Sequence, residues 1–191
     1  MAHTTWLKRR RWWLLRGMGL VEVLVVVGVL GVLATLALPS LAGLLDRLRL
    51  STHNNDVLAH LALARHEAIK RGQRVVMCKS ADGARCTRSG QWQQGWLVFV
   101  DLNNNAELDL GEEVLRQQAA WPAGWVLKGN TPVSRYVSYH PIGLSLMVSG
   151  AFQAGTFTVC KTSVQAVEGR QVVISSNGRP RSQVAQLPSC S

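Results

Sequence analysis

The chain lacks the residue patterns that carry enzyme chemistry. Its 191 residues contain no nucleophile motif, no glycine-rich phosphate loop and no C-x2-C cysteine pair of the kind that binds zinc. His53, His60 and His66 follow one another at intervals of seven and six residues, so we expect them on a helix surface without a shared metal. The sequence therefore predicts a protein that is not an enzyme and has no cofactor.

Acidic residues are scarce in the second part of the chain. Glu168 is the only acid from residue 116 to residue 191. The same stretch holds seven basic residues, namely Arg116, Lys128, Arg135, Lys161, Arg170, Arg179 and Arg181. The formal net charge is +10, but five basic residues precede Met18, so without residues 1–17 the balance is 16 basic against 11 acidic side chains, or +5. One face or end of the domain is therefore expected to be positive, which suits an anionic partner.

Charge is also almost absent from residues 18–38. Only Glu22 interrupts this apolar run, which is about as long as a helix that spans a bilayer. The basic residues before the run place the N-terminus in the cytoplasm and the remainder of the chain across the membrane. A secretory signal peptide has a shorter apolar region that ends in a small-x-small cleavage site. We therefore interpret residues 18–38 as a transmembrane helix.

An ionisable residue inside such a helix is costly and points to a function. The segment Arg16-Gly17-Met18-Gly19-Leu20-Val21-Glu22 resembles the signature of type IV prepilins. The resemblance implies that a prepilin peptidase removes a basic leader, residues 1–17, by cutting between Gly17 and Met18, and methylates the new amine of Met18. It also implies that Glu22 pairs with the N-terminal amine of a neighbouring pilin, and that Pro39 kinks the helix. The implied location is the bacterial inner membrane, and the pilus after assembly. A plain single-span anchor without a filament role is the alternative.

The region after the apolar run changes from helical to β-like periodicity. Apolar residues recur near the helical period through residues 39–71, which we interpret as an amphipathic continuation of the helix that stops at Gly72. β-Like runs follow at 74–79, 95–101, 114–119, 125–128, 136–139, 156–161 and 171–175. A helix laid on a mostly antiparallel sheet buries the apolar faces of both, so residues 72–191 are expected to form the β-rich part of an α+β fold.

The four cysteines all lie in this β-rich part. An even number of cysteines suits two disulfides formed in an oxidising compartment. The simplest connectivity is local and joins Cys78 to Cys86 and Cys160 to Cys190, although four cysteines permit three pairings.

The first β-like runs carry a second resemblance. Val76-Met77-Cys78, Asp82-Gly83, Cys86 and Trp92-x-x-Gly95-Trp96-x-Val98-Phe99-x-Asp101 resemble the GspH/FimT group of minor pilins and pseudopilins. The resemblance implies a pilin-like α+β fold and assembly with other pilins or pseudopilins through the N-terminal helix. Trp92, Trp96, Trp121 and Trp125 are then expected in the core or in an interface.

The segment from residue 101 to residue 112 has oxygen donors at the spacing of a calcium loop. The donors are Asp101, Asn103, Asn105, Asp109 and Glu112. Ala106 stands where such loops have glycine, and the flanking segments look like strands, whereas calcium loops of this kind join helices. Asn and Asp runs also form turns without a metal. We therefore favour a polar hairpin loop, with calcium binding as the alternative.

A basic turn lies near the C-terminus. Asn177-Gly178-Arg179-Pro180-Arg181 follows the last expected strand and resembles the Gly-Arg-x-Arg motif of FimT-like minor pilins that bind DNA during natural transformation. The resemblance implies that Gly178, Arg179 and Arg181 contact the DNA backbone, and arginine forks pair well with phosphate oxygens. A solvated basic turn without function is the alternative.

Two functions follow from these patterns. The leading one is a minor type IV pilin that enters a pilus and binds DNA non-specifically for uptake. The alternative is a structural pseudopilin of a type II secretion system, which needs the same anchor and fold but not the arginine turn.

Overall fold

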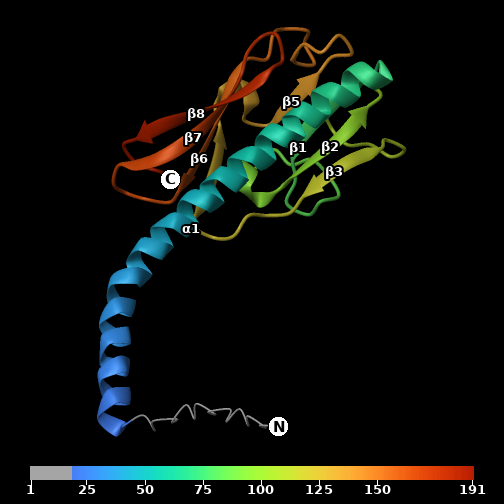
Figure 1. Cartoon of the computed structure of the whole chain (residues 1–191). Helices are drawn as coiled ribbons and strands as arrows, with labels where there is room; N and C mark the ends of the chain where they lie inside the picture. The colour runs from blue at the N-terminus through green and yellow to red at the C-terminus, as the bar shows by residue number, and fades with distance from the viewer. Residues whose placement is uncertain (1–18) are drawn as a thin grey trace, which may run out of the picture. The chain divides into compact units, whose positions relative to one another are not determined.

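The computed structural model describes residues 19–191, apart from the side chains of residues 36–40 (Figure 1). The chain divides into two compact units, Met1–Gly43 and Leu44–Ser191, and each is described by itself.

A single long helix, α1, extends over Leu20–Arg71. Glu22 lies in its first turn and Lys70 and Arg71 in its last, which suits the partial charges at the two helix ends. Gly72 follows with a φ of 65°, as expected for a glycine that stops a helix. Pro39 belongs to the helical backbone, but its side chain lies outside the described part, so a kink there stays a prediction.

The second unit contains two antiparallel sheets of four strands. The first sheet has the order β3-β2-β1-β5, with β1 at Arg74–Lys79, β2 at Trp96–Asp101, β3 at Val114–Gln118 and β5 at Tyr136–Tyr139. The second has the order β4-β6-β7-β8, with β4 at Trp125–Gly129, β6 at Gly155–Lys161, β7 at Val167–Ile174 and β8 at Pro180–Leu187. Two short 3-10 turns, η1 at Trp92–Gln94 and η2 at Thr131–Val133, connect strands.

One hydrophobic core joins α1 to both sheets. Figure 1 shows the second part of α1 crossing the strands, and its buried residues Leu50, Val57, Leu61, Ala64 and Ala68 recur at helical spacing. They pack with apolar side chains of both sheets. The four tryptophans that were expected in the core or in an interface all lie in this core, namely Trp92, Trp96, Trp121 and Trp125. The α+β class expected from the sequence is the observed one.

Two disulfides close loops within the second unit. Cys78 is bonded to Cys86, and Cys160 to Cys190, which is the local pairing that the sequence favoured. The first bond closes the loop after β1. The second joins β6 to the segment after β8, where Cys190 also exchanges two backbone hydrogen bonds with Ser163.

The strand prediction was wrong at the C-terminus. The sequence placed its last strand at 171–175, whereas β7 covers Val167–Ile174 and a further strand, β8, follows it. Arg179 and Arg181 therefore do not lie in a tail after the sheet but in and beside a hairpin turn. Pro180 is the first residue of β8, a place where proline is tolerated because β8 is an edge strand.

Candidate functional site

The basic turn between β7 and β8 is tightly built. The Gly178 N–H donates to the Ser175 carbonyl at 2.9 Å, and the Arg179 N–H donates to Oδ1 of Asn177 at 3.1 Å. Gly178 has a φ of 77°, which favours glycine, and it is buried, while Arg179 is exposed. These bonds hold the backbone around Arg179 in one conformation.

The turn rests on a second turn at residues 140–143. A Cβ at Gly178 would lie 2.3 Å from the Gly143 carbonyl oxygen, so only glycine allows this approach. The same carbonyl accepts a hydrogen bond of 2.9 Å from Nε of Arg65 on α1. Three segments far apart in the sequence therefore meet at Gly143.

The structure separates the two predicted DNA-binding arginines. Arg181 pairs with Val173 in the β7–β8 register, and the neighbouring pair Val172 and Ser182 faces α1, where the Ser182 hydroxyl lies 3.0 Å from Oδ1 of Asn54. Because side chains alternate along a strand, Arg181 lies on the opposite, outer face of the sheet. Arg179, in the turn, lines an open groove along α1.

The outer face that carries Arg181 has a polar row beside an apolar cluster that includes Val126, Cys160 and Leu187. The register places Lys128, Thr158, Gln171 and Gln183 in one row across β4, β6, β7 and β8 on this face. Nε2 of Gln183 donates to Oε1 of Gln171 at 3.0 Å. Glu168 is the only acid of these four strands, and its side chain lies on the other face because side chains alternate along a strand. A polyanion on the outer face would therefore meet Lys128 and Arg181 without an opposing carboxylate.

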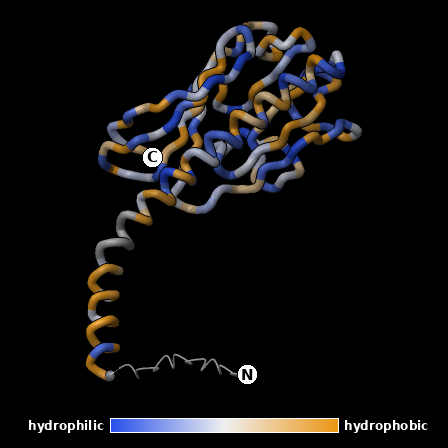
Figure 2. The backbone as a smooth tube through the Cα atoms, viewed as in Figure 1, coloured by the Kyte–Doolittle hydropathy of each residue, from blue (hydrophilic) through white to orange (hydrophobic). Residues whose placement is uncertain are grey.

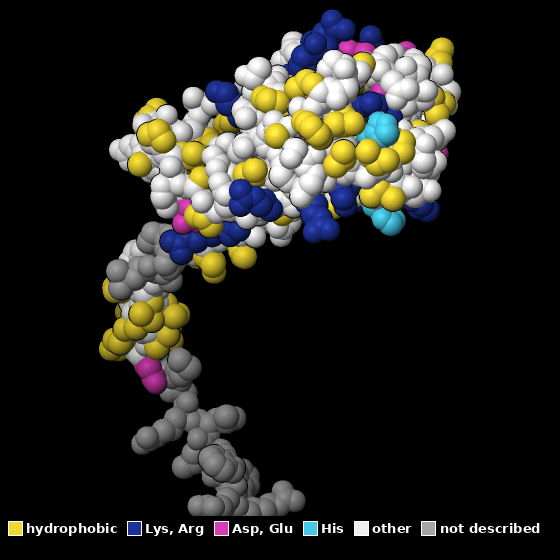
Figure 3. All heavy atoms as spheres, turned by 90° about the horizontal axis from the view of Figure 1, so that it is seen from above, with side chains coloured by type: hydrophobic (Ala, Val, Ile, Leu, Met, Phe, Trp, Pro, Cys, Tyr) yellow, Lys and Arg dark blue, Asp and Glu magenta, His cyan; other side chains and the backbone are white. Residues whose placement is uncertain are grey.

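Five acidic side chains are already engaged in ion pairs elsewhere. Glu67, Asp82, Glu107, Glu113 and Asp46 pair with Lys70, Arg71, Arg85, Arg88, Arg135 and Lys161. Within residues 19–191, neither Arg179 nor Arg181 takes part in an ion pair. In Figure 3 the basic side chains form several separate groups on the visible face, among few acidic ones. On this face the positive charge is therefore distributed and does not form one large patch.

The segment with calcium-loop spacing satisfies its carboxylates internally. Asp101 is buried and accepts the backbone N–H groups of Asn105 and Ala106 at 3.1 and 3.0 Å. Asp109 accepts the side-chain amides of Asn103 and Asn105 at 2.8 and 2.7 Å, and these bonds lower its pKa. Glu112 accepts the N–H groups of Leu102 and Asp109. Among the residues that the structure describes, no group of three or more His, Cys, Asp or Glu side chains is placed to hold a metal.

Two of the three helix histidines are not surface residues. The His60 ring is buried, and its Nδ1 accepts the indole N–H of Trp96 at 3.1 Å. The His53 ring stacks on Trp121 with centroids 4.1 Å apart. Burial lowers the pKa of both imidazoles, helped by the charge of Arg116 for His60 and of Arg49 for His53. The surface prediction failed because the side of α1 that packs on the tryptophans includes these polar rings, and only His66 is exposed.

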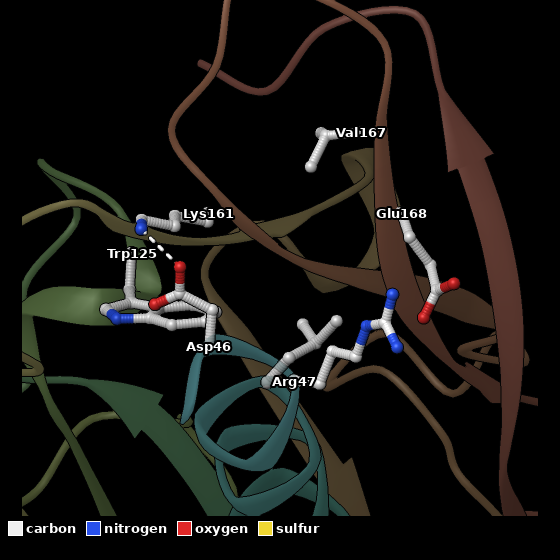
Figure 4. A pocket seen from close by; sticks show the side chains of 7 residues that line it. Asp46, Arg47, Trp125, Lys161, Val167 and Glu168 are labelled. Atoms are coloured by element: carbon white, nitrogen blue, oxygen red, sulfur yellow. Dashed lines mark hydrogen bonds and ion pairs between the residues drawn. The ribbon is translucent and has the colours of Figure 1, made fainter. Parts of the chain in front are cut away.

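A small pocket lies where the start of the second unit's helix meets the second sheet. It has a volume of about 210 Å³ and is lined by Asp46, Arg47, Leu50, Trp125, Lys161, Val167 and Glu168. Nζ of Lys161 lies 2.6 Å from Oδ2 of Asp46, and Figure 4 shows the Arg47 guanidinium facing the Glu168 carboxylate. The ion pair between Lys161 and Asp46 connects α1 to β6.

The predicted processing site lies outside the described residues, because Gly17 and Met18 precede residue 19. Glu22 is described and is exposed near the start of α1, where the Glu22 N–H donates to the Gly19 carbonyl at 3.0 Å. Apolar side chains around it are exposed too, and Figure 2 shows this part of α1 as hydrophobic with one hydrophilic position near its beginning. Within the described residues, no helix combines the length and the apolarity required to cross a membrane.

Residues 53–178 match the family described as "Type II transport protein GspH". This match covers more than half of the chain, from the middle of α1 to the arginine turn. The chain belongs to the GspH family. Members of the family are pilin-like structural proteins, so the chain is a minor type IV pilin or pseudopilin and not an enzyme.

Known proteins resemble this GspH-family chain in sequence and in fold. It is 32% identical over 166 residues to the "Pilin-like protein PilA1" of Thermus thermophilus, covering 87% of this chain and 97% of that protein. The type IV minor pilin FimU of Pseudomonas aeruginosa has a similar fold, with a TM-score of 0.56 and 20% identity over 76% of this chain and 98% of FimU. The minor pseudopilin EpsH of the Vibrio cholerae type 2 secretion system is similar with a TM-score of 0.44 and 14% identity over 75% of this chain and 96% of EpsH.

Proposed function

We propose that the protein is a minor type IV pilin that enters a pilus and binds DNA through its C-terminal arginine turn during DNA uptake. The observation that carries the proposal is the pair Arg179 and Arg181, which are exposed and lack ion-pair partners among the described residues. A backbone held by the bonds at Asn177 and Gly178 limits the entropy lost when these arginines bind phosphate.

We further propose that the chain is anchored in the bacterial inner membrane with its N-terminus in the cytoplasm. In this proposal the prepilin peptidase removes residues 1–17, residues 18–38 span the membrane, and Glu22 meets the amine of a neighbouring pilin. The exposed apolar surface from Leu20 to Leu33 supports the proposal, because such a surface requires lipid or other helices around it.

DNA binding by the purified chain, measured by fluorescence anisotropy at several salt concentrations, tests the proposal. We expect modest affinity that falls as salt rises, with a log-log slope of about −0.9 per phosphate contacted on duplex DNA. Arg179→Ala and Arg181→Ala should each weaken binding by a similar factor on every sequence, since phosphate contacts do not read bases. Arg116→Ala removes an exposed charge from the other sheet and serves as the control. Salt-independent binding, or a double variant that binds like the wild type, would remove the DNA role.

The second candidate is a structural pseudopilin of a type II secretion system. It is favoured by the family match, whose description names type II transport. In that function the arginine turn is unnecessary, so the Arg179→Ala, Arg181→Ala double variant should support protein secretion as well as the wild type does.

A further inference from the structure

An open groove lies between α1 and the turn that joins β7 to β8. It has a volume of about 640 Å³ and is lined by Asn55, Leu58, Ala59, Ala62 and Arg65 from α1 and by Arg179 and Pro180 from the turn. Its floor is made of small and apolar side chains, and none of its lining residues is acidic. The groove therefore combines an uncharged floor with two cations from different elements.

The two arginines are tied to the same point of the backbone. Arg65 donates from Nε to the Gly143 carbonyl at 2.9 Å, and Gly178, the residue before Arg179, packs against that carbonyl. A guanidinium has five N–H donors, so this bond leaves the four on the two Nη atoms of Arg65 for another acceptor. Arg65 forms no ion pair within the described residues.

Two cations held at one groove without a carboxylate favour an anion between or along them. Grooves that bind a nucleic acid strand without sequence preference combine positive charge that follows the backbone with aromatic side chains on which bases stack. This groove has the positive charge of Arg65 and Arg179 but no aromatic lining residue, so its expected contacts are with the phosphodiester backbone.

We propose that this groove binds a phosphodiester backbone, with Arg65 of α1 as a contact residue beside Arg179. The inference rests on the proposed DNA binding and adds to it a path for the strand and a residue outside the arginine motif. Arg181 lies on the other face of the sheet and does not belong to this groove.

The test measures binding of the full chain, purified in detergent, to labelled single-stranded and duplex oligonucleotides of one sequence across a range of salt. Arg65→Ala and Arg179→Ala should each weaken binding about tenfold, the usual effect of losing a hydrogen bond to a charged group. Each should also reduce the salt slope by about 0.7 on the single strand or about 0.9 on the duplex. The control Arg116→Ala should change affinity by no more than about twofold and leave the slope unchanged, because Arg116 lies on β3 and does not line the groove.

The outcomes separate this inference from the proposed function. If Arg179→Ala weakens binding while Arg65→Ala behaves like Arg116→Ala, the groove is wrong and the DNA role stands. If the wild-type chain shows no salt-dependent binding, both are wrong. If Arg65→Ala weakens binding to the single-stranded oligonucleotide more than to the duplex, the groove takes single strands. The reverse result indicates that it takes the edge of a duplex.

A second pair of variants leaves the Arg65–Gly143 bond in place. Ala62 is exposed on the groove floor, and Thr52 is exposed on α1 outside the groove. Glutamate suits a helix at both positions. Ala62→Glu places a negative charge in the groove and should weaken binding at least tenfold, whereas Thr52→Glu should change it by no more than about twofold. Equal binding by the two variants would overturn the groove.

Discussion

At the scale of single residues, the helix surface that packs on the sheets is unusual in containing imidazoles. His60 and His53 lie against Trp96 and Trp121, where apolar side chains are usual, and burial lowers the pKa of each ring. The indole N–H of Trp96 requires an unprotonated Nδ1 on His60, so protonation of that nitrogen removes a hydrogen bond from the core.

The stability of the second unit should therefore depend on pH in the range where histidines titrate. The pKa of both rings is lowered in the folded state, so the unfolded chain binds more protons as pH falls below about 6.5. Stability should be full above that pH and decrease towards pH 5, measured by urea unfolding followed by tryptophan fluorescence. His60→Gln should be less stable by about 1 kcal/mol at pH 7.5 and lose part of the pH dependence. An unchanged pH profile in His60→Gln would contradict this.

Gly178 should resist substitution for two reasons. Its φ of 77° disfavours other residues, and a Cβ would lie 2.3 Å from the Gly143 carbonyl oxygen. Gly150 has a φ of 86° but open space around it, so Gly150→Ala measures the backbone strain alone. We expect Gly150→Ala to cost about 1 kcal/mol and Gly178→Ala about 2–3 kcal/mol in chemical denaturation, with the extra loss due to the clash. Equal losses would show that the turn can move away from Gly143.

At the scale of elements, the second disulfide should stabilise β8 specifically. Cys160 and Cys190 enclose a separation of 30 residues, against 8 for Cys78 and Cys86. Loop-closure entropy predicts a loss of about 3.5 kcal/mol for Cys160→Ser with Cys190→Ser, and about 2.5 kcal/mol for the other pair. Hydrogen exchange should quicken in β8 when the long bond is removed and stay slow in β1. Equal exchange in both strands would contradict a local effect.

The elements differ in how well the sequence predicts them. Strands β1 and β5 have the predicted bounds because their buried β-branched residues lie between clear turns. β8 was missed since Pro180-Arg181-Ser182-Gln183 begins it with polar residues and a proline, and only an edge strand tolerates that pattern. β8 is defined by its pairing with β7 and by the long-range disulfide. Neither can be recognised from a short stretch of sequence.

The candidate site was predicted in composition but not in arrangement. The motif identified Gly178, Arg179 and Arg181, yet the separation of the two arginines onto different faces depends on the register of β7 with β8. Arg65 carried no signal, because its place beside the turn depends on Gly143, which is 78 residues away. Such contacts between distant segments follow from the tertiary fold and not from residue types.

At the scale of the whole molecule, membership of the GspH family implies assembly with other pilins. The part of α1 around Glu22 exposes its apolar side chains on all sides, whereas the part within the second unit is half covered by the sheets. The apolar surface around Glu22 suits contacts with lipid or with neighbouring helices.

Glu22 should be required for assembly but not for processing. In the wild type, mass spectrometry should find a chain that begins at a methylated Met18. Glu22→Ala should be cut in the same way but enter filaments poorly, because the amine of a neighbour would be buried without a counter-charge. Normal incorporation of Glu22→Ala would refute the pairing, and an intact Met1 in cells that have the peptidase would refute the processing.

Because Arg179 and Arg181 lie on different faces of one hairpin, a flexible ligand can contact both more easily than a stiff one. Arg181 lies on the outer face of the second sheet and Arg179 lines the groove beside α1, so a polymer that contacts both guanidinium groups passes around the edge strand β8. Duplex DNA has a persistence length of about 50 nm and resists such a bend. A single strand is flexible on this scale and can follow the edge. If DNA binds to this hairpin as we propose, contact with both arginines would favour a single strand over a duplex without reading any base.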